Sequence, residues 1–269
     1  MKYDKSKYFM NDEREIQRLS QKVNPETFIE KFISPVINES DLILDIGCGP
    51  GVIDAHIAKT FPNSHITCLD INPTMINYVV ANRQNQSQID AHVGDAHELP
   101  YQNDFYDFVF ARFLVEYLHS PLLGVSEMVR VCKPGGRIML QDLDGQLLWH
   151  YPEEQSLQAV IEKIITFLNN RTGFDPFVGR KLFHYLYKNG VTDIEVKAEP
   201  YNFFSGRIDE KNYNLWKLKL DIATPQIIAC LGNKRDALAY KTKYLEYLKR
   251  DDTMSYSILF NVSGTKRIE

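Results

Sequence analysis

The sequence predicts an α/β protein with a doubly wound, mostly parallel sheet, and three observations support this fold class. Short apolar runs alternate with helix-like patterns between residues 41 and 145. The first apolar run, residues 42–46, leads directly into a glycine-rich turn at 47–51. Two further strand patterns, at 192–198 and 255–262, bring the predicted strands to seven. Alternating strands and helices imply parallel strands joined by right-handed crossovers.

Residues 1–40 precede the first strand, and their pattern predicts one or two helices. The first spans Glu13 to Gln21. The second begins near Pro25 and continues through Ile33, because proline is favoured at the first helical position.

Three glycines stand at alternate positions after the first strand, in the order Asp45-x-Gly47-x-Gly49-x-Gly51. Glycine lets the chain turn sharply and brings the backbone close to a ligand, and the next helix points its unpaired N–H groups there. A dinucleotide-binding turn needs its third glycine at the sixth position, which is Val52 here. The Gly-Lys-Ser/Thr ending of a phosphate-binding loop is also absent. Taken alone, the pattern is also compatible with a tight turn that binds no ligand.

Acidic residues end the next two predicted strands. The run 66–69 ends in Asp70, and the run 89–93 closes with Gly-Asp-Ala at 94–96. A carboxylate at the tip of the second strand is well placed to accept hydrogen bonds from ribose hydroxyls. Each acid alone is equally typical of a cap on the following helix.

A fourth strand is predicted at 105–111, followed by a helix at 122–131 and a fifth strand at 137–140. The sequence Lys-Pro-Gly-Gly at 133–136 separates this helix from the fifth strand. Proline and glycine together are typical of such a connection.

The glycine turn, the two strand-end acids and the Lys-Pro-Gly-Gly turn follow one another over residues 41–145. In this order and spacing they resemble the class I S-adenosylmethionine-dependent methyltransferases. The resemblance implies a Rossmann-like sheet whose seventh strand is antiparallel. It also implies that S-adenosyl-L-methionine is the cofactor and that the protein is an enzyme transferring its methyl group.

The resemblance further implies which residues contact the cofactor. The backbone of the turn would lie beside the methionyl part, with Asp45 near its amino group. Asp70 would bind the ribose, and Arg18 the carboxylate, whose geometry a guanidinium matches. For Arg18 and Arg112, a solvated arginine and an ordinary ion pair are equally compatible readings. The full set of expected cofactor-binding residues is Arg18, Asp45, Gly47, Cys48, Gly49, Gly51, Asp70, Ile71, Asp95, Ala96 and Arg112.

Catalytic residues are harder to predict, because alignment with an activated methyl group supplies much of the acceleration. An unactivated hydroxyl or carbon acceptor would still need a general base. We consider His150 and His184 as candidates and expect alanine at either to reduce turnover with little loss of cofactor affinity. Residues 110–121 resemble small-molecule methyltransferases that often have histidine where this chain has Tyr117, whereas His119 is more typical of a solvated or capping residue.

Acceptor contacts are expected from a loop after the fifth strand, since that end of the sheet would face the cofactor. The aromatic side chains there are suited to stacking on a planar acceptor. The candidates are Asp142, Asp144, Trp149, His150 and Tyr151.

Helices are predicted at 153–171 and 176–188, and a long helical stretch at 205–252 separates the last two strands. We interpret this stretch as an insertion over the carboxyl ends of the strands that forms a substrate cap, with an oligomer interface as the alternative.

The expected organisation is an N-terminal helical lid at 1–40, a cofactor-binding core and the insertion at 205–252. The core would comprise residues 41–204 together with 253–269.

The composition of the chain excludes some classes of function. A formal net charge of −4 over 269 residues argues against a nucleic-acid-binding protein. The four cysteines show no CxxC pair, no N-terminal apolar signal segment appears, and no apolar run is long enough to cross a bilayer. We therefore expect a soluble cytoplasmic protein with reduced cysteines, no metal, no membrane partner and possible homodimers.

The function predicted from the sequence is methylation of an oxygen or nitrogen of a small molecule. A protein or RNA methyltransferase and a non-catalytic S-adenosylmethionine-binding protein remain the alternatives. A dehydrogenase is disfavoured by Val52.

Overall fold

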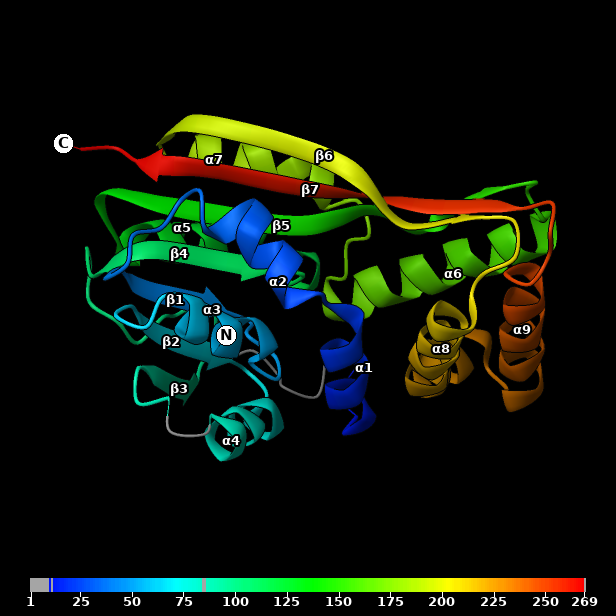
Figure 1. The fold of residues 1–269 in the computed structure, drawn as a ribbon. Helices are drawn as coiled ribbons and strands as arrows, with labels where there is room; N and C mark the ends of the chain where they lie inside the picture. The colour runs from blue at the N-terminus through cyan, green and yellow to red at the C-terminus, as the bar shows by residue number, and fades with distance from the viewer. Residues whose placement is uncertain (1–9, 11, 84–85, 269) are drawn as a thin grey trace.

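The computed structural model describes residues 10, 12–83 and 86–268, apart from the side chains of 146–149. Its centre is a seven-stranded sheet in the order β3-β2-β1-β4-β5-β7-β6 (Figure 1). The bounds are β1 Leu42–Ile46, β2 His65–Asp70, β3 Ile89–Val93, β4 Tyr106–Arg112, β5 Cys132–Tyr151, β6 Val191–Ser205 and β7 Met254–Lys266. Strand β7 is antiparallel to both of its neighbours, and the pairs from β3 to β5 are parallel. The predicted fold class is confirmed.

Two apolar cores cover the two faces of this sheet. Successive side chains of a strand point to opposite faces. In β1, accordingly, Ile43 packs into one core while Leu44 and Ile46 pack into the other. Helices α5 (Pro121–Val131) and α7 (Leu182–Lys188) cover the second face.

The first face is covered by a different set of helices. These are α2 (Pro25–Phe28) with the π-helical turn Ile29–Ile33 that continues it, α3 (Val52–Thr60) and α4 (Pro73–Asn82). The parallel strands are therefore buried on both sides.

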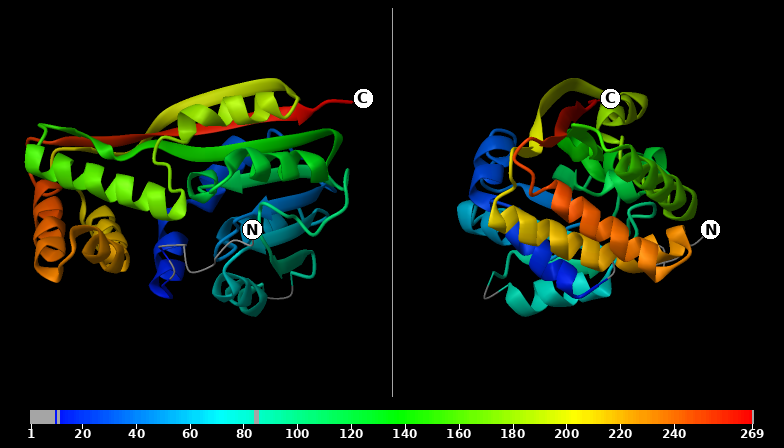
Figure 2. Two further views of the ribbon diagram at one scale, coloured as in Figure 1. Left: turned by 180° about the vertical axis from the view of Figure 1, so that it is seen from behind. Right: turned by 90° about the vertical axis from the view of Figure 1, so that its right-hand side faces the viewer.

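A third core lies beyond the parallel part of the sheet, where β5, β6 and β7 continue past β1 to β4 (Figures 1 and 2). It is formed by α6 (Gln155–Thr172), α8 (Glu210–Leu231) and α9 (Lys234–Tyr247). Gly232, with φ of 81°, ends α8, and the Asn233 side chain accepts from the backbone N–H of Asp236 to begin α9. Helix α1 (Arg14–Lys22) lies against α8 (Figure 2).

The loop expected after the fifth strand is not present, and this expectation was wrong. Strand β5 continues to Tyr151 and pairs with β7, with Asp144 opposite Ile258 and Tyr151 opposite Met254. The antiparallel partner supplies hydrogen bonds beyond the point where β4 ends, so the chain stays extended there.

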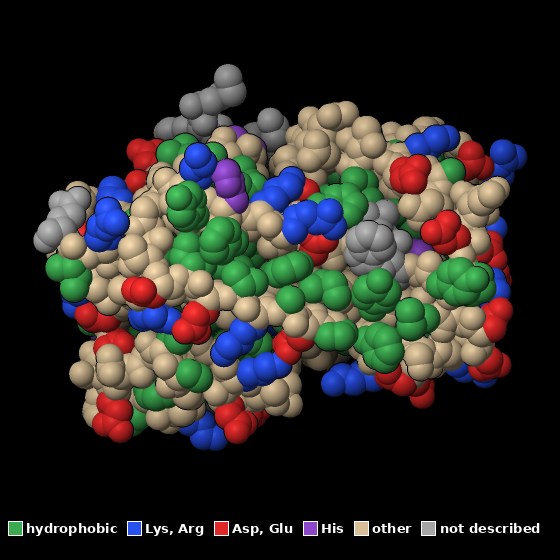
Figure 3. Space-filling model, turned by 90° about the horizontal axis from the view of Figure 1, so that it is seen from above, with side chains coloured by type: hydrophobic (Ala, Val, Ile, Leu, Met, Phe, Trp, Pro, Cys, Tyr) green, Lys and Arg blue, Asp and Glu red, His purple; other side chains and the backbone are tan. Residues whose placement is uncertain are grey.

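Strand β6 forms one edge of the sheet, and Val196 and Phe203 are exposed on it. Figure 3, which views the molecule from that side, shows a band of hydrophobic side chains across this face. Within the described part of the chain, no helix combines the length and apolar character needed to cross a membrane.

We expect Tyr244→Ala to lower the free energy of unfolding by about 3–5 kcal/mol, because it removes a buried aromatic ring from the third core. The Tyr244 ring is 5.7 Å from that of Trp216 and 6.1 Å from that of Tyr240, between centroids. Urea denaturation measures the change. Tyr187→Ala is the control, since Tyr187 is 64% exposed, and should change the value by about 0.5 kcal/mol or less. Equal losses in both variants would contradict this account.

Candidate functional site

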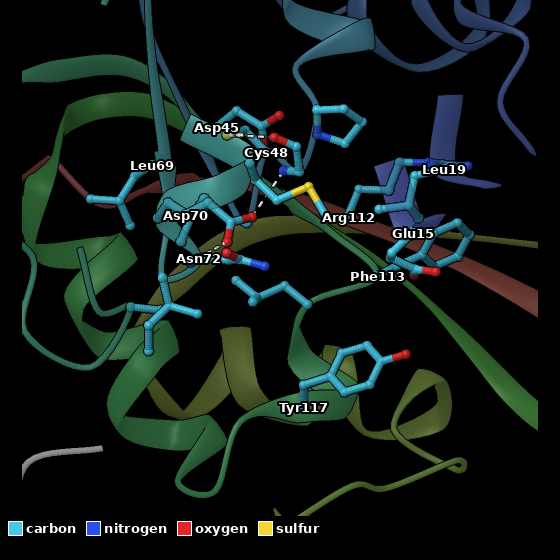
Figure 4. Close-up of a pocket in the computed structure, with 18 of the residues that line it drawn as sticks. Glu15, Leu19, Asp45, Cys48, Leu69, Asp70, Asn72, Arg112, Phe113 and Tyr117 are labelled. Carbon is cyan, nitrogen blue, oxygen red and sulfur yellow. Dashed lines mark hydrogen bonds between the residues drawn. The ribbon is translucent and has the colours of Figure 1, made fainter. Parts of the chain in front are cut away.

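One large cavity opens at the carboxyl ends of β1, β2 and β4, and the glycine turn forms part of its wall (Figure 4). The cavity and its mouth enclose about 1350 Å³. Helices α1 and α8 supply the wall on the side away from the sheet.

The glycine turn is fixed by the end of β2. The backbone N–H groups of Gly47 and Cys48 donate to the carbonyl oxygen of Leu69 over 2.7 and 3.1 Å. Gly47, Gly49 and Gly51 have φ of 78°, 56° and 69°, which side chains with a Cβ rarely adopt. A Cβ at Gly51 would also lie 2.8 Å from Val79. Gly47, Cys48 and Gly49 line the cavity, whereas Gly51 begins α3 and does not.

Asp70 stands beside this turn. Its carboxylate accepts from the backbone N–H of Gly49 over 2.9 Å and of Asn72 over 2.8 Å (Figure 4). Burial raises the pKa of Asp70. Asp70 and Ile71 both line the cavity.

Asp95 and Ala96 line the cavity where β3 ends. The Asp95 carboxylate accepts from the backbone N–H of His97 over 2.9 Å and lies 2.7 Å from its Nδ1. His119 does not line the cavity, and its ring is tilted by 44° to that of His97, with centroids 4.0 Å apart.

Two carboxyl groups meet beneath the glycine turn. Asp45 and Asp54 are 3% and 0% exposed, and Asp45 lines the cavity. Burial raises the pKa of Asp54 to about 6, and burial with the neighbouring Asp54 raises the pKa of Asp45 well above its usual value. Asp45 Oδ1 has no hydrogen-bond partner among the described residues. This oxygen can therefore accept a hydrogen bond from a cationic group bound in the cavity.

Several charged side chains line the cavity on the side of α1, among them Glu15 and Arg112, which Figure 4 labels. Arg18 donates to both oxygens of Glu15, over 2.7 Å from Nε and 2.6 Å from Nη2. Lys22 also comes from α1, whereas Glu116 follows β4 and Lys219 belongs to α8.

Phe113 contacts two cationic side chains on this wall. Its ring centroid is 4.1 Å from Lys22 Nζ and 4.1 Å from Arg112 Cζ, both within cation–π range. Arg112 Nε donates to Gln141 over 2.8 Å. Phe113 has φ of 54°, a conformation that is rare outside glycine.

Glu15, Lys22, Glu116 and Lys219 were not among the residues expected at the site. Glu15 and Lys22 lie three residues before and four residues after Arg18, which is the spacing of one helix face. This spacing could have identified Glu15 and Lys22 as neighbours of Arg18 from the sequence alone. Lys219 reaches the cavity only through the packing of α8 against α1, which no local pattern reveals.

Of the candidates on the extended β5, Asp142, Asp144, His150 and Tyr151 do not line the cavity. Asp142 is buried beneath it and accepts from the backbone N–H of Glu116 over 3.0 Å. Asp144 is paired with Arg180 over 2.5 Å. Tyr151 is 71% exposed, and the side chain of Trp149 lies outside the described part of the structure.

The two histidines proposed as bases lie elsewhere. His150 packs against Tyr244 and Tyr247 of α9, with ring centroids 5.9 and 5.5 Å away. His184 is exposed on α7. Neither lines the cavity, so the structure does not support a base at these positions. No group of three His, Cys, Asp or Glu side chains suited to a metal occurs among the residues described.

Comparison with known sequences points to one kind of domain. Residues 44–140 match a family described as "Methyltransferase domain". The chain is 34% identical to a malonyl-[acyl-carrier protein] O-methyltransferase of Hahella chejuensis over 114 residues, which are 40% of each protein. It is 30% identical to ajmaline N-methyltransferase of Rauvolfia serpentina over 133 residues, 46% of this chain and 42% of that protein. The chain thus spans about half or less of the length of these relatives.

Solved structures share the fold. A phosphoethanolamine N-methyltransferase 2 of Haemonchus contortus, in complex with S-adenosyl-L-methionine, has a TM-score of 0.62 and 15% identity, covering 98% of this chain and 59% of that one. A structure from Bacillus halodurans described as a putative methyltransferase has a TM-score of 0.60 and 13% identity, covering 91% of this chain and 99% of that one. At these identities the likeness concerns the fold alone.

The buried Asp45–Asp54 pair predicts a pH-dependent stability. Because the pKa of Asp54 is raised to about 6 in the folded chain, its contribution to stability is present below its unfolded pKa near 4 and is lost as pH rises through about 6. Asp54→Asn has no carboxyl group to ionise at this position, so it should not lose this stability as pH rises. We expect the variant to be about 1–2 kcal/mol more stable than wild type at pH 8, with a smaller advantage at pH 4.5.

Urea denaturation of the ligand-free protein at the two pH values measures the difference. Asp90→Asn, at an exposed position on β3, controls for the general effect of removing a carboxylate. A difference between wild type and Asp54→Asn that stays constant with pH would contradict the raised pKa.

Proposed function

We propose that this chain, whose residues 44–140 match a methyltransferase domain, transfers the methyl group of S-adenosyl-L-methionine to an oxygen or nitrogen of a small molecule. The observation that carries the proposal is the cavity in which the glycine turn, Asp70 and Asp95 lie together at the carboxyl ends of the strands. Open α/β sheets bind their ligands at this edge.

The residues present fit the cofactor. Asp70 offers its carboxylate to the ribose hydroxyls, with Ile71 and Ala96 beside the adenine and Asp95 at its edge. The backbone of Gly47, Cys48 and Gly49 then lies along the methionyl part.

The amino-acid end of the cofactor is a zwitterion, and both of its charges find a partner. The orphaned oxygen of Asp45 accepts from the ammonium group, which stabilises the ionised form of Asp45. Arg18 lies on the same cavity wall for the carboxylate, held in place by Glu15.

When bound, the cofactor supplies a methyl group already activated by the positive sulfur. The chain's own contribution is to align an acceptor with that methyl group and to exclude water. The cavity is walled by α1, α8 and the sheet, and these walls would hold the acceptor in position and limit its contact with water.

A small-molecule acceptor is supported by the names of the relatives, which act on a malonyl-carrier protein and on ajmaline. A protein or RNA acceptor and a binding protein without turnover are the alternative outcomes. A methyl-transfer assay with labelled cofactor against metabolite, protein and RNA fractions separates them. Cytoplasmic location and the homodimer stay predictions.

We expect Asp70→Ala to weaken binding of S-adenosylhomocysteine by about 10- to 100-fold, because a charge-assisted hydrogen bond contributes about 1.5–3 kcal/mol. Titration calorimetry measures the affinity. Asp90→Ala is the matched control, since Asp90 is an exposed strand residue outside the cavity, and should bind as wild type does. If wild type ignored S-adenosylhomocysteine but bound NAD, the proposal would fail.

A further inference from the structure

His97 follows Asp95 and Ala96, the two residues that the proposed function places at the adenine ring, and it lines the same cavity. Its side chain is 8% exposed. A buried polar side chain needs hydrogen-bond partners, because unpaired polar atoms are costly to remove from water. One partner of His97 is Asp95, so this contact bears on how an adenine ring would be held.

Two hydrogen bonds join His97 to one oxygen of Asp95. The backbone N–H of His97 donates to Asp95 Oδ1 over 2.9 Å, and the ring Nδ1 lies 2.7 Å from the same oxygen. The first bond closes a turn typical of aspartate, whose side chain accepts from the backbone N–H two residues on. The second bond depends on the side chain at position 97. Both bonds use Oδ1, so Oδ2 is the oxygen left for a ligand in the cavity.

The contact with Asp95 also fixes which nitrogen of the His97 ring carries a proton. An ionised carboxylate accepts hydrogen bonds and donates none. Nδ1 must therefore be protonated for the 2.7 Å contact to be a hydrogen bond. Nδ1–H is a donor both in this neutral tautomer and in the imidazolium cation, so either form of the ring can hold the carboxylate.

The segment that carries His97 is fixed to helix α5. The backbone N–H of Leu99 donates to Glu127 over 2.9 Å, and Arg130 donates to the carbonyl oxygen of Leu99 over 3.0 Å. Leu99 itself is buried. On its other side, the ring of His97 lies against that of His119, with centroids 4.0 Å apart. The ring and the backbone of His97 are therefore both held in place.

The amino group of adenine is what a rigid carboxylate can recognise. This group donates hydrogen bonds, whereas a 6-oxopurine has at the same position a carbonyl oxygen that only accepts them. A carboxylate oxygen held at this edge attracts the first base and repels the second. A carboxylate that is free to rotate can turn away from the second base and then discriminates weakly. Selection between the bases therefore depends on how firmly Asp95 is held.

We propose that His97 is a positioning residue for the cofactor: its Nδ1–H holds Asp95 Oδ1, so that Oδ2 faces the amino group of adenine and the cavity selects a 6-aminopurine nucleoside over a 6-oxopurine one. This assignment rests on the proposed binding of S-adenosyl-L-methionine. It adds the residue on which the base selectivity of that binding depends.

The first experiment compares S-adenosylhomocysteine with S-inosylhomocysteine, its 6-oxo counterpart, by titration calorimetry. Wild type should bind the amino compound at least about 30-fold more tightly, because the 6-oxo base leaves Asp95 without a donor. Asp95→Ala should bring the ratio of the two affinities close to one. Equal affinities in wild type would overturn the role of the Asp95–His97 pair. If wild type bound neither compound, the proposed function would fail and this inference with it.

Two substitutions of His97 separate the hydrogen bond from the packing of the ring. His97→Asn loses the ring but places an amide N–H near the position of Nδ1, so it should keep the affinity ratio within about threefold of wild type. His97→Phe keeps a ring beside His119 but has no donor, so the ratio should fall by about tenfold or more. A role in packing alone predicts the opposite order of the two variants.

Further variants test whether His97 acts through Asp95. His97→Gln carries its amide near the position of Nε2 and should behave as His97→Phe does. In the Asp95→Ala background, His97→Phe should leave the affinity ratio unchanged. His92→Phe is the control, since His92 is exposed on β3 and outside the cavity. Equal losses in His97→Asn and His97→Phe, or a further loss in the Asp95→Ala background, would overturn the proposal.

NMR of the unaltered protein tests the hydrogen bond independently of how the variants fold. In the complex with S-adenosylhomocysteine, long-range proton–nitrogen spectra should show a proton on Nδ1 of His97. The signals of His97 are identified by their loss in His97→Asn. A proton on Nδ1, alone or together with one on Nε2, supports the assignment. A proton on Nε2 alone would overturn it, because the ring would then have no donor for Asp95.

Discussion

The carbonyl oxygen of Leu69 is the point on which the site depends. It accepts two backbone hydrogen bonds from the turn that follows β1 and so ties the ends of β1 and β2 together. This brings the backbone N–H of Gly49 to the carboxylate of Asp70. Because the turn requires left-handed backbone at alternate residues, glycine is the residue type that permits it at low cost. The cavity floor is thus set by main-chain geometry.

The wall of the cavity on the side away from the sheet depends on a different feature, the length of β5 and β7. Their antiparallel pairing continues beyond the parallel strands and supports a third core of α6, α8 and α9. Helix α1 packs against α8, which places side chains of both helices on the cavity. The polar end of the cavity is therefore built by packing between elements about 200 residues apart in the chain.

Local patterns were sufficient to predict the sheet and to bring Gly47, Asp70 and Asp95 to one edge of it, where they line the cavity. Gly47, Asp70 and Asp95 each follow a strand, and parallel strands bring their carboxyl ends together. The expectation of a loop after the fifth strand was wrong, because residues 141–151 stay extended through their pairing with β7. The sequence of this segment alone does not reveal that pairing. Lys219 was missed for a similar reason, since only the contact between α1 and α8 places it. Contacts between distant segments are what a local pattern does not encode.

The placement of Lys22 and Lys219 on helices outside the central sheet has an evolutionary consequence. Substitutions in these helices alter the lining of the cavity while leaving the hydrogen bonds of Leu69 and Asp70 intact. Selection can therefore change the side chains at one end of the cavity without disturbing the glycine turn at the other. Sequence drift between such proteins should concentrate in the flanking helices, and the strand ends should change slowly.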